Sequence, residues 1–143
     1  MRLDECMTRG VECVHPDTML QEVARKMRDL DVGTIPVCGN EDRLVGILTD
    51  RDITIRSVSL GMDPKSTRVD QVMTPAVVFC YEDQPIEEAA RLMEDRQIRR
   101  LPVLDHDRRL TGILSLGDLA VSGPDERQLA AEALEAISIT TPR

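Results

Sequence analysis

Aromatic side chains are almost absent from this chain of 143 residues, which has one phenylalanine, Phe79, one tyrosine, Tyr81, and no tryptophan. Proteins that bind single-stranded nucleic acid by stacking need aromatic platforms, so a bound base would lie mainly against aliphatic side chains here. The net charge of −8 argues further against a chain whose main task is to grip nucleic acid, because that task needs a basic surface. We therefore expect no nucleic-acid partner.

Long apolar runs are also missing, and none approaches the roughly 20 residues that a membrane helix needs. The first residues are charged at once and no apolar stretch follows them, which does not resemble a signal peptide. Hydrophobic residues make up 41% of the chain and charged residues 31%, as is typical of soluble globular proteins. We expect a cytoplasmic protein without a membrane partner.

Catalytic motifs are equally scarce. The two histidines, His15 and His106, both stand beside turn residues, and the turn around His106 predicts an exposed side chain. A nucleophile elbow, a phosphate loop and a metal-binding helix motif are all missing from the sequence. The sequence therefore predicts a protein that is not an enzyme and requires no cofactor.

The strongest positive feature is an internal duplication. Residues 3–53 and 69–119 align without a gap at a constant offset of 66 positions. The matching pairs include Met7-Thr8 with Met73-Thr74, Pro36-Val37 with Pro102-Val103, and Leu44–Asp52 with Leu110–Asp118. Two copies of this length predict a pseudo-twofold pair of repeats rather than a solenoid.

Each repeat has the pattern strand, helix, strand, strand, helix. This pattern predicts a fold of the α/β class that mixes α/β and α+β features. The expected strands are 12–14, 34–38 and 44–48 in the first repeat, and 77–80, 100–104 and 110–114 in the second. The last two strands of each repeat are joined by polar turns and should form antiparallel hairpins. Pro36 and Pro102 suggest strand edges or strand starts, and Gly46 and Gly112 mark points where another backbone or a ligand approaches closely.

The first helix of each repeat is indicated by apolar residues at helical spacing. Thr18 and Gln21 predict a capping box at the first of these helices, and Pro85 suits the first turn of its counterpart. The expected apolar faces are Leu20, Val23, Ala24, Met27 and Leu30 in the first repeat, and Ile86, Ala89, Ala90 and Met93 in the second.

The predicted domain bounds follow from the duplication: repeat one at 1–61, a linker at 62–68, repeat two at 69–122, and a helix with a tail at 123–143. A repeat of about 50–60 residues buries little apolar surface, so we expect the two sheets to pack face to face with a ligand cleft between them. The additional helix presents one apolar face and should pack on the pair or on a second subunit. That face comprises Leu129, Ala130, Ala133, Leu134 and Ile137.

Two segments that follow strands and open helices are candidate sites, with two interpretations of the same atoms. Thr49 with Asp52, and Ser115 with Asp118, match a variant capping box that stabilises a helix start without any ligand. Alternatively, free backbone N–H groups at these helix starts favour phosphate, and an ionised aspartate can accept hydrogen bonds from both ribose hydroxyls. Both interpretations can hold together, so both stay open.

The doubled Gly-Ile-Leu-Thr/Ser-x-x-Asp segments, the Pro-Val strands and the Met-Thr starts together resemble a tandem cystathionine-β-synthase (CBS) domain pair, or Bateman module, over residues 3–121. The layout is similar to small stand-alone CBS-pair proteins of bacteria and archaea, a group that includes a stress-response protein. The resemblance implies an adenosine-containing ligand such as AMP, ADP, ATP, NAD or S-adenosylmethionine, bound in the cleft between repeats. It also implies a homodimer.

The resemblance assigns Asp52 and Asp118 to ribose and places Thr49 and Ser115 at the Thr/Ser position of the motif. Arg99 and Arg100 match a basic position of the family that often touches phosphate, whereas the first repeat has Gly33-Thr34 there. This difference predicts two unequal sites. The implied function is a regulatory module whose output passes through the dimer or an unidentified protein partner.

Two alternatives to a nucleotide sensor stay open. One is a structural or protein-interaction dimer with a vestigial cleft. The other uses Cys13 and Cys38, which fall on strands expected to be parallel neighbours, as a redox pair or as a metal site with His15. The simplest interpretation is that the four cysteines are small, partly buried thiols, because disulfides are rare in the cytosol.

Overall fold

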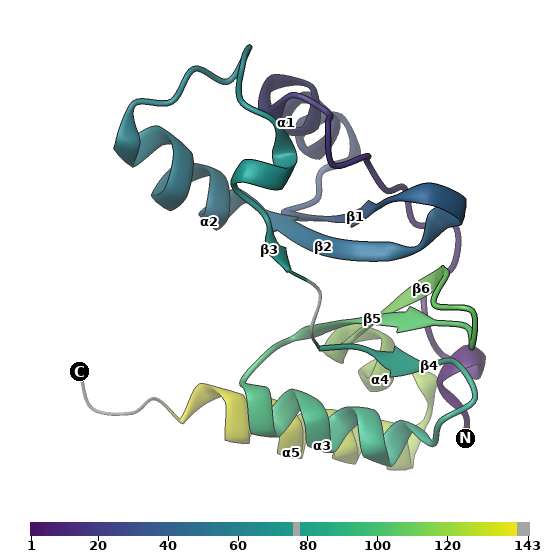
Figure 1. Ribbon diagram of the computed structural model, residues 1–143. Coiled ribbons are helices and arrows are strands. Elements are labelled where there is room, and N and C mark those ends of the chain that lie inside the picture. Colours follow the sequence, from purple (N-terminus) through teal and green to yellow (C-terminus); the bar gives the residue numbers. More distant parts are fainter. Residues whose placement is uncertain (76–77, 140–143) are drawn as a thin grey trace. The chain divides into compact units, whose positions relative to one another are not determined.

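The computed structural model describes residues 1–75 and 78–139, and it divides into two compact units. One unit contains Met1–Val11 and Val78–Arg143, and the other contains Glu12–Val77 (Figure 1). Both units combine helices with a three-stranded sheet, which confirms the predicted mixed α/β class. Among the described residues, no helix is both long and apolar enough to cross a bilayer.

The unit of residues 12–77 is built on the strands β1 (Thr34–Cys38), β2 (Leu44–Thr49) and β3 (Thr74–Pro75), in the order β1-β2-β3. All its strand pairs are antiparallel. Helix α1 (Leu20–Leu30) contributes Leu20, Val23 and Met27 to the core, which they share with residues of β1 and β2. The predicted hairpin of β1 and β2 is confirmed.

The other unit has the strand order β4-β5-β6, with β4 (Cys80–Tyr81) parallel to β5 (Arg100–Leu104) and β6 (Leu110–Ser115) antiparallel to it. Its helices are α3 (Ile86–Arg96), α4 (Leu116–Ser122) and α5 (Pro124–Ser138). Figure 1 shows α3 and α5 running side by side beneath this sheet. The predicted additional helix therefore exists and packs within this unit.

The compact units do not follow the boundaries of the sequence repeats. The segment that opens the first repeat lies in the unit of the second: Leu3 is fully buried there, and Thr8 forms a two-way backbone bridge with Ile113. Reciprocally, Val69 is buried in the other unit, and β3 pairs with β2. Each repeat thus lends its first segment to the unit formed by the rest of the other repeat.

Several local predictions need correction. Helix α1 begins after Met19, which makes no side-chain cap, so the predicted capping box of Thr18 and Gln21 is wrong. The expected strand at 12–14 is reduced to one parallel bridge between Val14 and Val37. In the second repeat, the corresponding strand is Cys80–Tyr81, later than expected, while Val77 lies outside the described residues.

The two strand prolines occupy different positions in their sheets. Pro36 lies in β1 at one edge of its sheet, as expected, whereas Pro102 lies in β5, the central strand. Pro102 is tolerated there because β4 is short and pairs only with Val103 and Leu104. Pro85 is the residue just before α3 rather than part of its first turn, and the predicted face of α3 is fully buried.

The helix after β2 is irregular. It starts as α2 (Asp50–Asp52), continues as a π-helix over Ile53–Ser57 and ends in a 3₁₀ turn at Val58–Leu60. Its counterpart α4 is regular, so this difference is confined to one repeat. Ile55, Val58 and Leu60 project apolar surface to solvent within their unit.

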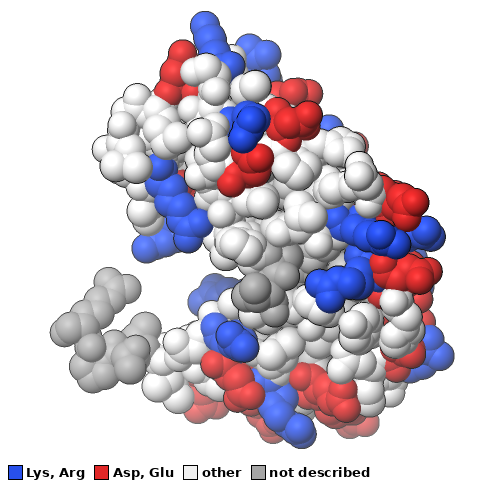
Figure 2. Space-filling model, in the orientation of Figure 1, with Lys and Arg blue, Asp and Glu red and all other residues white. Residues whose placement is uncertain are grey.

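Acidic and basic side chains are interspersed over the visible face of each unit (Figure 2). The apolar faces of α1 and α5 are narrower than predicted, because Leu30 and Leu134 remain largely exposed. In α5, Ala130, Ala133 and Ile137 are buried and hold the helix on the unit. Leu134 is therefore left free of the core contacts that fix α5.

Candidate functional site

Both predicted capping boxes are present. Thr49 Oγ1 accepts the N–H of Asp52 at 3.0 Å, and Asp52 Oδ2 accepts the N–H of Thr49 at 3.0 Å. Ser115 and Asp118 repeat the arrangement at 3.1 and 2.9 Å. The four side chains therefore stabilise helix starts, whatever else they bind.

The carboxylate of Asp118 has a further partner that the sequence reasoning missed. Thr8 Oγ1 donates to Asp118 Oδ1 at 3.1 Å, so the N-terminal segment is tied to the start of α4. An ionised carboxylate offers about four lone-pair sites, and the bonds from Ser115 and Thr8 use two. Acceptor capacity therefore remains on Asp118 for a hydroxyl. The duplicated Met-Thr pair was the available signal for Thr8.

Asp52 has different surroundings. Arg56 Nε lies 3.9 Å from Asp52 Oδ1, and Arg56 Nη1 donates to the carbonyl oxygens of Val72 and Met73. The position that matches Arg56 in the second repeat is Ser122, whose hydroxyl donates to the backbone carbonyl of Asp118. A cation thus lies beside the carboxylate of Asp52, whereas the matching Ser122 supplies no charge to the carboxylate of Asp118.

Gly46 and Gly112 are approached closely by backbone. A Cβ at Gly112 would lie 2.6 Å from the carbonyl oxygen of Thr8, and a Cβ at Gly46 would lie 2.9 Å from that of Thr74. The close approach predicted at these glycines is therefore accounted for by the strand segment that each repeat receives from the other.

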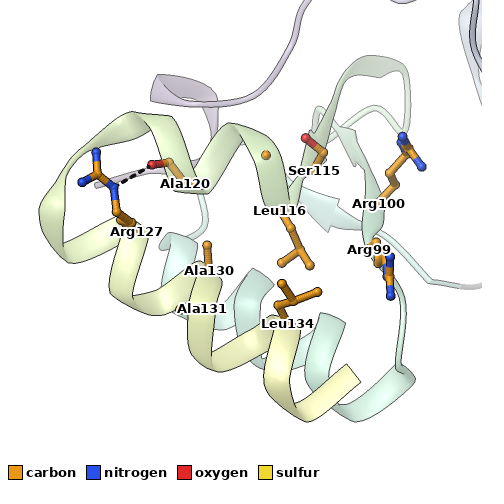
Figure 3. A pocket seen from close by; sticks show the side chains of 10 residues that line it. Arg99, Arg100, Ser115, Leu116, Ala120, Arg127, Ala130, Ala131 and Leu134 are labelled. Atoms are coloured by element: carbon orange, nitrogen blue, oxygen red, sulfur yellow. Dashed lines mark hydrogen bonds between the residues drawn. The ribbon is translucent and has the colours of Figure 1, made fainter. Parts of the chain in front are cut away.

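Arg99 and Arg100 meet Ser115 at a pocket of about 560 Å³ in the unit that contains α4 and α5 (Figure 3). The remaining lining residues are Leu116, Gly117, Ala120, Arg127, Ala130, Ala131 and Leu134. The volume falls within the range of about 300–1,000 Å³ found for small-molecule sites. Neither Asp118 nor Gly112 lines this pocket, and Thr49 and Asp52 belong to the other unit.

The pocket carries a positive charge within an acidic chain. Three arginines, Arg99, Arg100 and Arg127, line it and no acidic residue does. Within residues 1–75 and 78–139, none of the three forms an ion pair. Because the protein supplies no counter-charge there, the pocket favours an anion.

The first repeat has a smaller and differently charged surface pocket. It measures about 320 Å³ and is lined by Asp50, Arg51, Thr54 and Ile55. At the position matching Arg99, Gly33 leaves room that a carboxylate oxygen of Asp50 approaches: a Cβ on Gly33 would lie 3.1 Å from it. One acid balances one base here, which supports the prediction of two unequal sites.

The thiols of Cys13 and Cys38 are neighbours, as expected from the parallel bridge beside them. Burial, followed by a hydrogen bond with Cys13, raises the pKa of Cys38, and burial raises the pKa of Cys80 to about 11. Buried thiols with raised pKa values are poor nucleophiles at neutral pH. All four cysteines are free, and within the described chain no group of three metal-binding side chains, with His15 or otherwise, is present.

His106 is exposed, as predicted, but it is not isolated. Its ring stacks on Tyr81 with centroids 4.7 Å apart, and its Nε2 lies 2.8 Å from Asp83 Oδ2. The hydrogen bond and charge of Asp83 raise the pKa of His106, and the same bond lowers the pKa of Asp83. The ion pair stabilises the fold at pH values between the pKa of Asp83 and the pKa of His106. This stabilisation is lost as the pH rises through the pKa of His106 or falls through the pKa of Asp83.

Replacing Asp83 with asparagine is expected to return the pKa of His106 toward the ordinary value of about 6.5. This variant removes the negative charge that favours the imidazolium and weakens the hydrogen bond to it. An NMR titration of the His106 ring protons measures the change, and an unaltered titration midpoint would contradict the assignment of Asp83 as the cause.

Comparison with known proteins places these features in a family context. A family model described as CBS domain matches residues 3–58 and 69–122. The chain is 36% identical over 121 residues to Hypoxic response protein 1 of Mycobacterium tuberculosis, which covers 85% of this chain and 84% of that protein. The expected likeness to small stand-alone proteins with two CBS domains is confirmed.

Two solved structures are similar to this chain. A crystal structure of Hypoxic Response Protein I with two coordinated zinc ions matches with a TM-score of 0.80 and 35% identity, covering 87% of this chain and 100% of that one. A crystal structure of CBSX2 in complex with AMP matches with a TM-score of 0.72 and 28% identity, covering 82% of this chain and 91% of that one.

Proposed function

Because this chain belongs to the CBS domain family and carries two CBS domains in tandem, we propose that it is a regulatory module that binds an adenosine-containing ligand. AMP, ADP, ATP, NAD and S-adenosylmethionine are the candidate ligands, and no cofactor is required. The observation that carries this proposal is the pocket that Arg99, Arg100 and Ser115 line together, with no acidic residue in its lining. The AMP complex of the similar CBSX2 supports the choice of ligand class.

In this proposal, the phosphate of the ligand contacts Arg99 and Arg100, because exposed guanidinium groups without ion-pair partners bind phosphate through several N–H donors. Asp118 does not line the pocket itself, but it is hydrogen-bonded to Ser115, which does, and we assign its remaining acceptor capacity to a ribose hydroxyl. Thr49 and Asp52 would play the matching roles in the first repeat, where the pairing of Asp52 with Arg56 and the absence of arginines at 33–34 weaken binding.

The regulatory step follows from differential affinity. A ligand that binds one conformation of the module better than another shifts the population toward that conformation by the difference in binding free energy. The proposed output acts on a second copy of the chain or on another protein. The proposed role is regulatory and not catalytic, and it is exercised in the cytoplasm.

Replacing both Arg99 and Arg100 with alanine is expected to abolish the thermal stabilisation that the ligand gives to the wild-type protein. At ligand concentrations of about 100 times Kd, the wild type should gain about 2.7 kcal/mol in free energy of unfolding. Both arginines are exposed, so the unliganded variant should keep the stability of the wild type. Thermal melts with each of the five candidate ligands measure the effect.

The matched control is the double replacement of Arg25 and Arg28 with alanine. These exposed arginines lie on α1, outside the lining of the pocket, and their loss changes the net charge by the same amount. Equal ligand-induced stabilisation in both double variants would show that Arg99 and Arg100 do not hold the ligand. No stabilisation of the wild type by any candidate would reject the nucleotide function itself.

One observation favours a second candidate function. Cys13 and Cys38 adjoin the two strand residues of the Val14–Val37 bridge, which supports a redox-responsive pair more than a metal site, since His15 is exposed and the described residues hold no cluster of three metal ligands. The similar Hypoxic Response Protein I coordinates zinc, which keeps metal binding as a proposal. A structural dimer and a part in a stress response remain predictions.

A further inference from the structure

The pocket beside Arg99 and Arg100 has a wall that lies outside both CBS domains. Ala130, Ala131 and Leu134 of α5 line it, and α5 lies beyond the matched range that ends at residue 122. Leu116 at the start of α4 forms the facing side, and its side chain points toward that of Leu134 (Figure 3). With Arg127, four of the ten lining residues therefore belong to a helix that the duplication did not create.

Helix α5 is held in place without using Ala131 or Leu134, two of its residues that line the pocket. Ala133 is fully buried and Ala130 and Ile137 nearly so, while Arg127 Nε donates to the carbonyl oxygen of Ala120 and Gln97 Nε2 donates to that of Ile139. Ala131 is exposed, and Leu134 is 44% exposed. Packing thus explains why α5 sits here, but it does not explain why a leucine faces Leu116 across the cavity.

The distribution of polarity along the pocket defines the ligand class. Arg99 and Arg100 lie at one end and Arg127 at the other, and the middle is formed by apolar groups, chiefly Leu116 and Leu134 (Figure 3). A bare inorganic anion would leave the apolar middle in water, and a neutral apolar molecule would leave the arginines without counter-charge. The complementary ligand has an apolar or flat part joined to a negative group.

We propose that α5 forms part of the ligand site, with the apolar part of an anionic ligand packed between Leu116 and Leu134 and its negative group beside Arg99 and Arg100. This inference rests on the proposed function, because it concerns the same pocket. It adds that a chain of this family without α5 would lack Ala130, Ala131 and Leu134 from the apolar lining, so affinity depends on a segment outside the repeats.

The test replaces Ala131 with tryptophan, which fills the apolar middle of the pocket while leaving the arginines and the capping boxes unchanged. Ala131 is exposed, so the fold should tolerate the larger side chain. The matched control is Glu135→Trp, which places the same ring at an exposed position of α5 that does not line the pocket. Two probes are titrated by calorimetry or fluorescence: AMP, and the amphiphilic anion 8-anilinonaphthalene-1-sulfonate.

We expect A131W to raise the Kd of both probes at least tenfold and E135W to leave both unchanged, with inorganic phosphate and adenosine each binding more weakly than AMP to the wild type. Unchanged affinity of both probes in A131W would overturn the inference, while binding of AMP that still depends on Arg99 and Arg100 would leave the proposed function standing. Binding of the naphthalene probe alone, lost in A131W, would support the amphiphilic site and reject the nucleotide.

Discussion

Replacing Leu3 with alanine is expected to lower the free energy of unfolding by about 3–5 kcal/mol, the usual range for a leucine truncated in a closed core. Leu3 is fully buried, and it packs with Met93, Leu101 and Leu114 rather than with the repeat in which it stands. The loss should therefore fall on the unit of residues 78–139. Native-state hydrogen exchange with mass spectrometry measures it, peptide by peptide.

The matched control is Val69→Ala, the same position in the second repeat. Val69 is fully buried in the other unit, so its truncation should cost about 2 kcal/mol and lower protection within residues 12–75 instead. The two variants thus form a reciprocal pair. If Leu3→Ala lowered the protection of residues 20–49 and spared α3 and β5, the exchange of opening segments between repeats would be refuted.

Gly112→Ala is the second variant with a large expected effect, a loss of about 2–3 kcal/mol in free energy of unfolding. The added Cβ would meet the carbonyl oxygen of Thr8 at 2.6 Å. That oxygen cannot move away cheaply, because Thr8 exchanges two backbone hydrogen bonds with Ile113, at 2.9 and 3.0 Å. The same shift would pull Thr8 Oγ1 from Asp118, so the start of α4 should loosen as well.

Gly117→Ala makes the same chemical change five residues further along the chain, and its effect on stability should have the opposite sign. A Cβ at Gly117 meets nothing nearer than Ser115 Oγ at 3.5 Å, and Gly117 lies in α4, where alanine is favoured by up to about 1 kcal/mol. Urea denaturation of both variants measures the difference. A similar loss in the two would mean that crowding by Thr8 is not what Gly112 relieves.

The periodic elements of the fold were predictable because their signals are local. The hairpin strands appear within one residue of their predicted bounds, since apolar and β-branched runs flanked by polar turns leave few other solutions. The buried face of α3 was also predicted in full, because helical spacing alone determines which side chains share a face. The same holds for the capping boxes at Thr49 and Ser115.

Predictions failed where a long-range partner replaced the local one. Thr18 does not cap α1, because its carbonyl accepts the N–H of Val69 and the chain enters the helix one residue later, at Met19. The strand expected at 12–14 has only Val37 beside it, so a single bridge forms. Local sequence patterns carry no information about such partners, which come from segments more than twenty residues away.

The residues of the candidate site also fall into those that the sequence predicted and those that it did not. Ser115 was predicted from the repeated helix-start motif and Arg99 and Arg100 from the resemblance to the CBS family, and the structure brings all three to one pocket. Thr8, Arg56 and the α5 wall were missed, since each reaches its place through tertiary packing. Thr8 had a faint signal in the duplicated Met-Thr pair, whereas Leu134 had been assigned to the packing face of α5.

The sequence by itself determined the duplication, the hairpin and the first helix of each copy, and the helix starts at Thr49 and Ser115, because repeats, periodicity and capping are written within a few residues. Only the tertiary structure decided that each copy lends its first segment to the other unit and that α5 closes one side of a cationic pocket. Those outcomes depend on which buried surfaces fit best between distant segments, and complementarity of shape across the chain has no local signature.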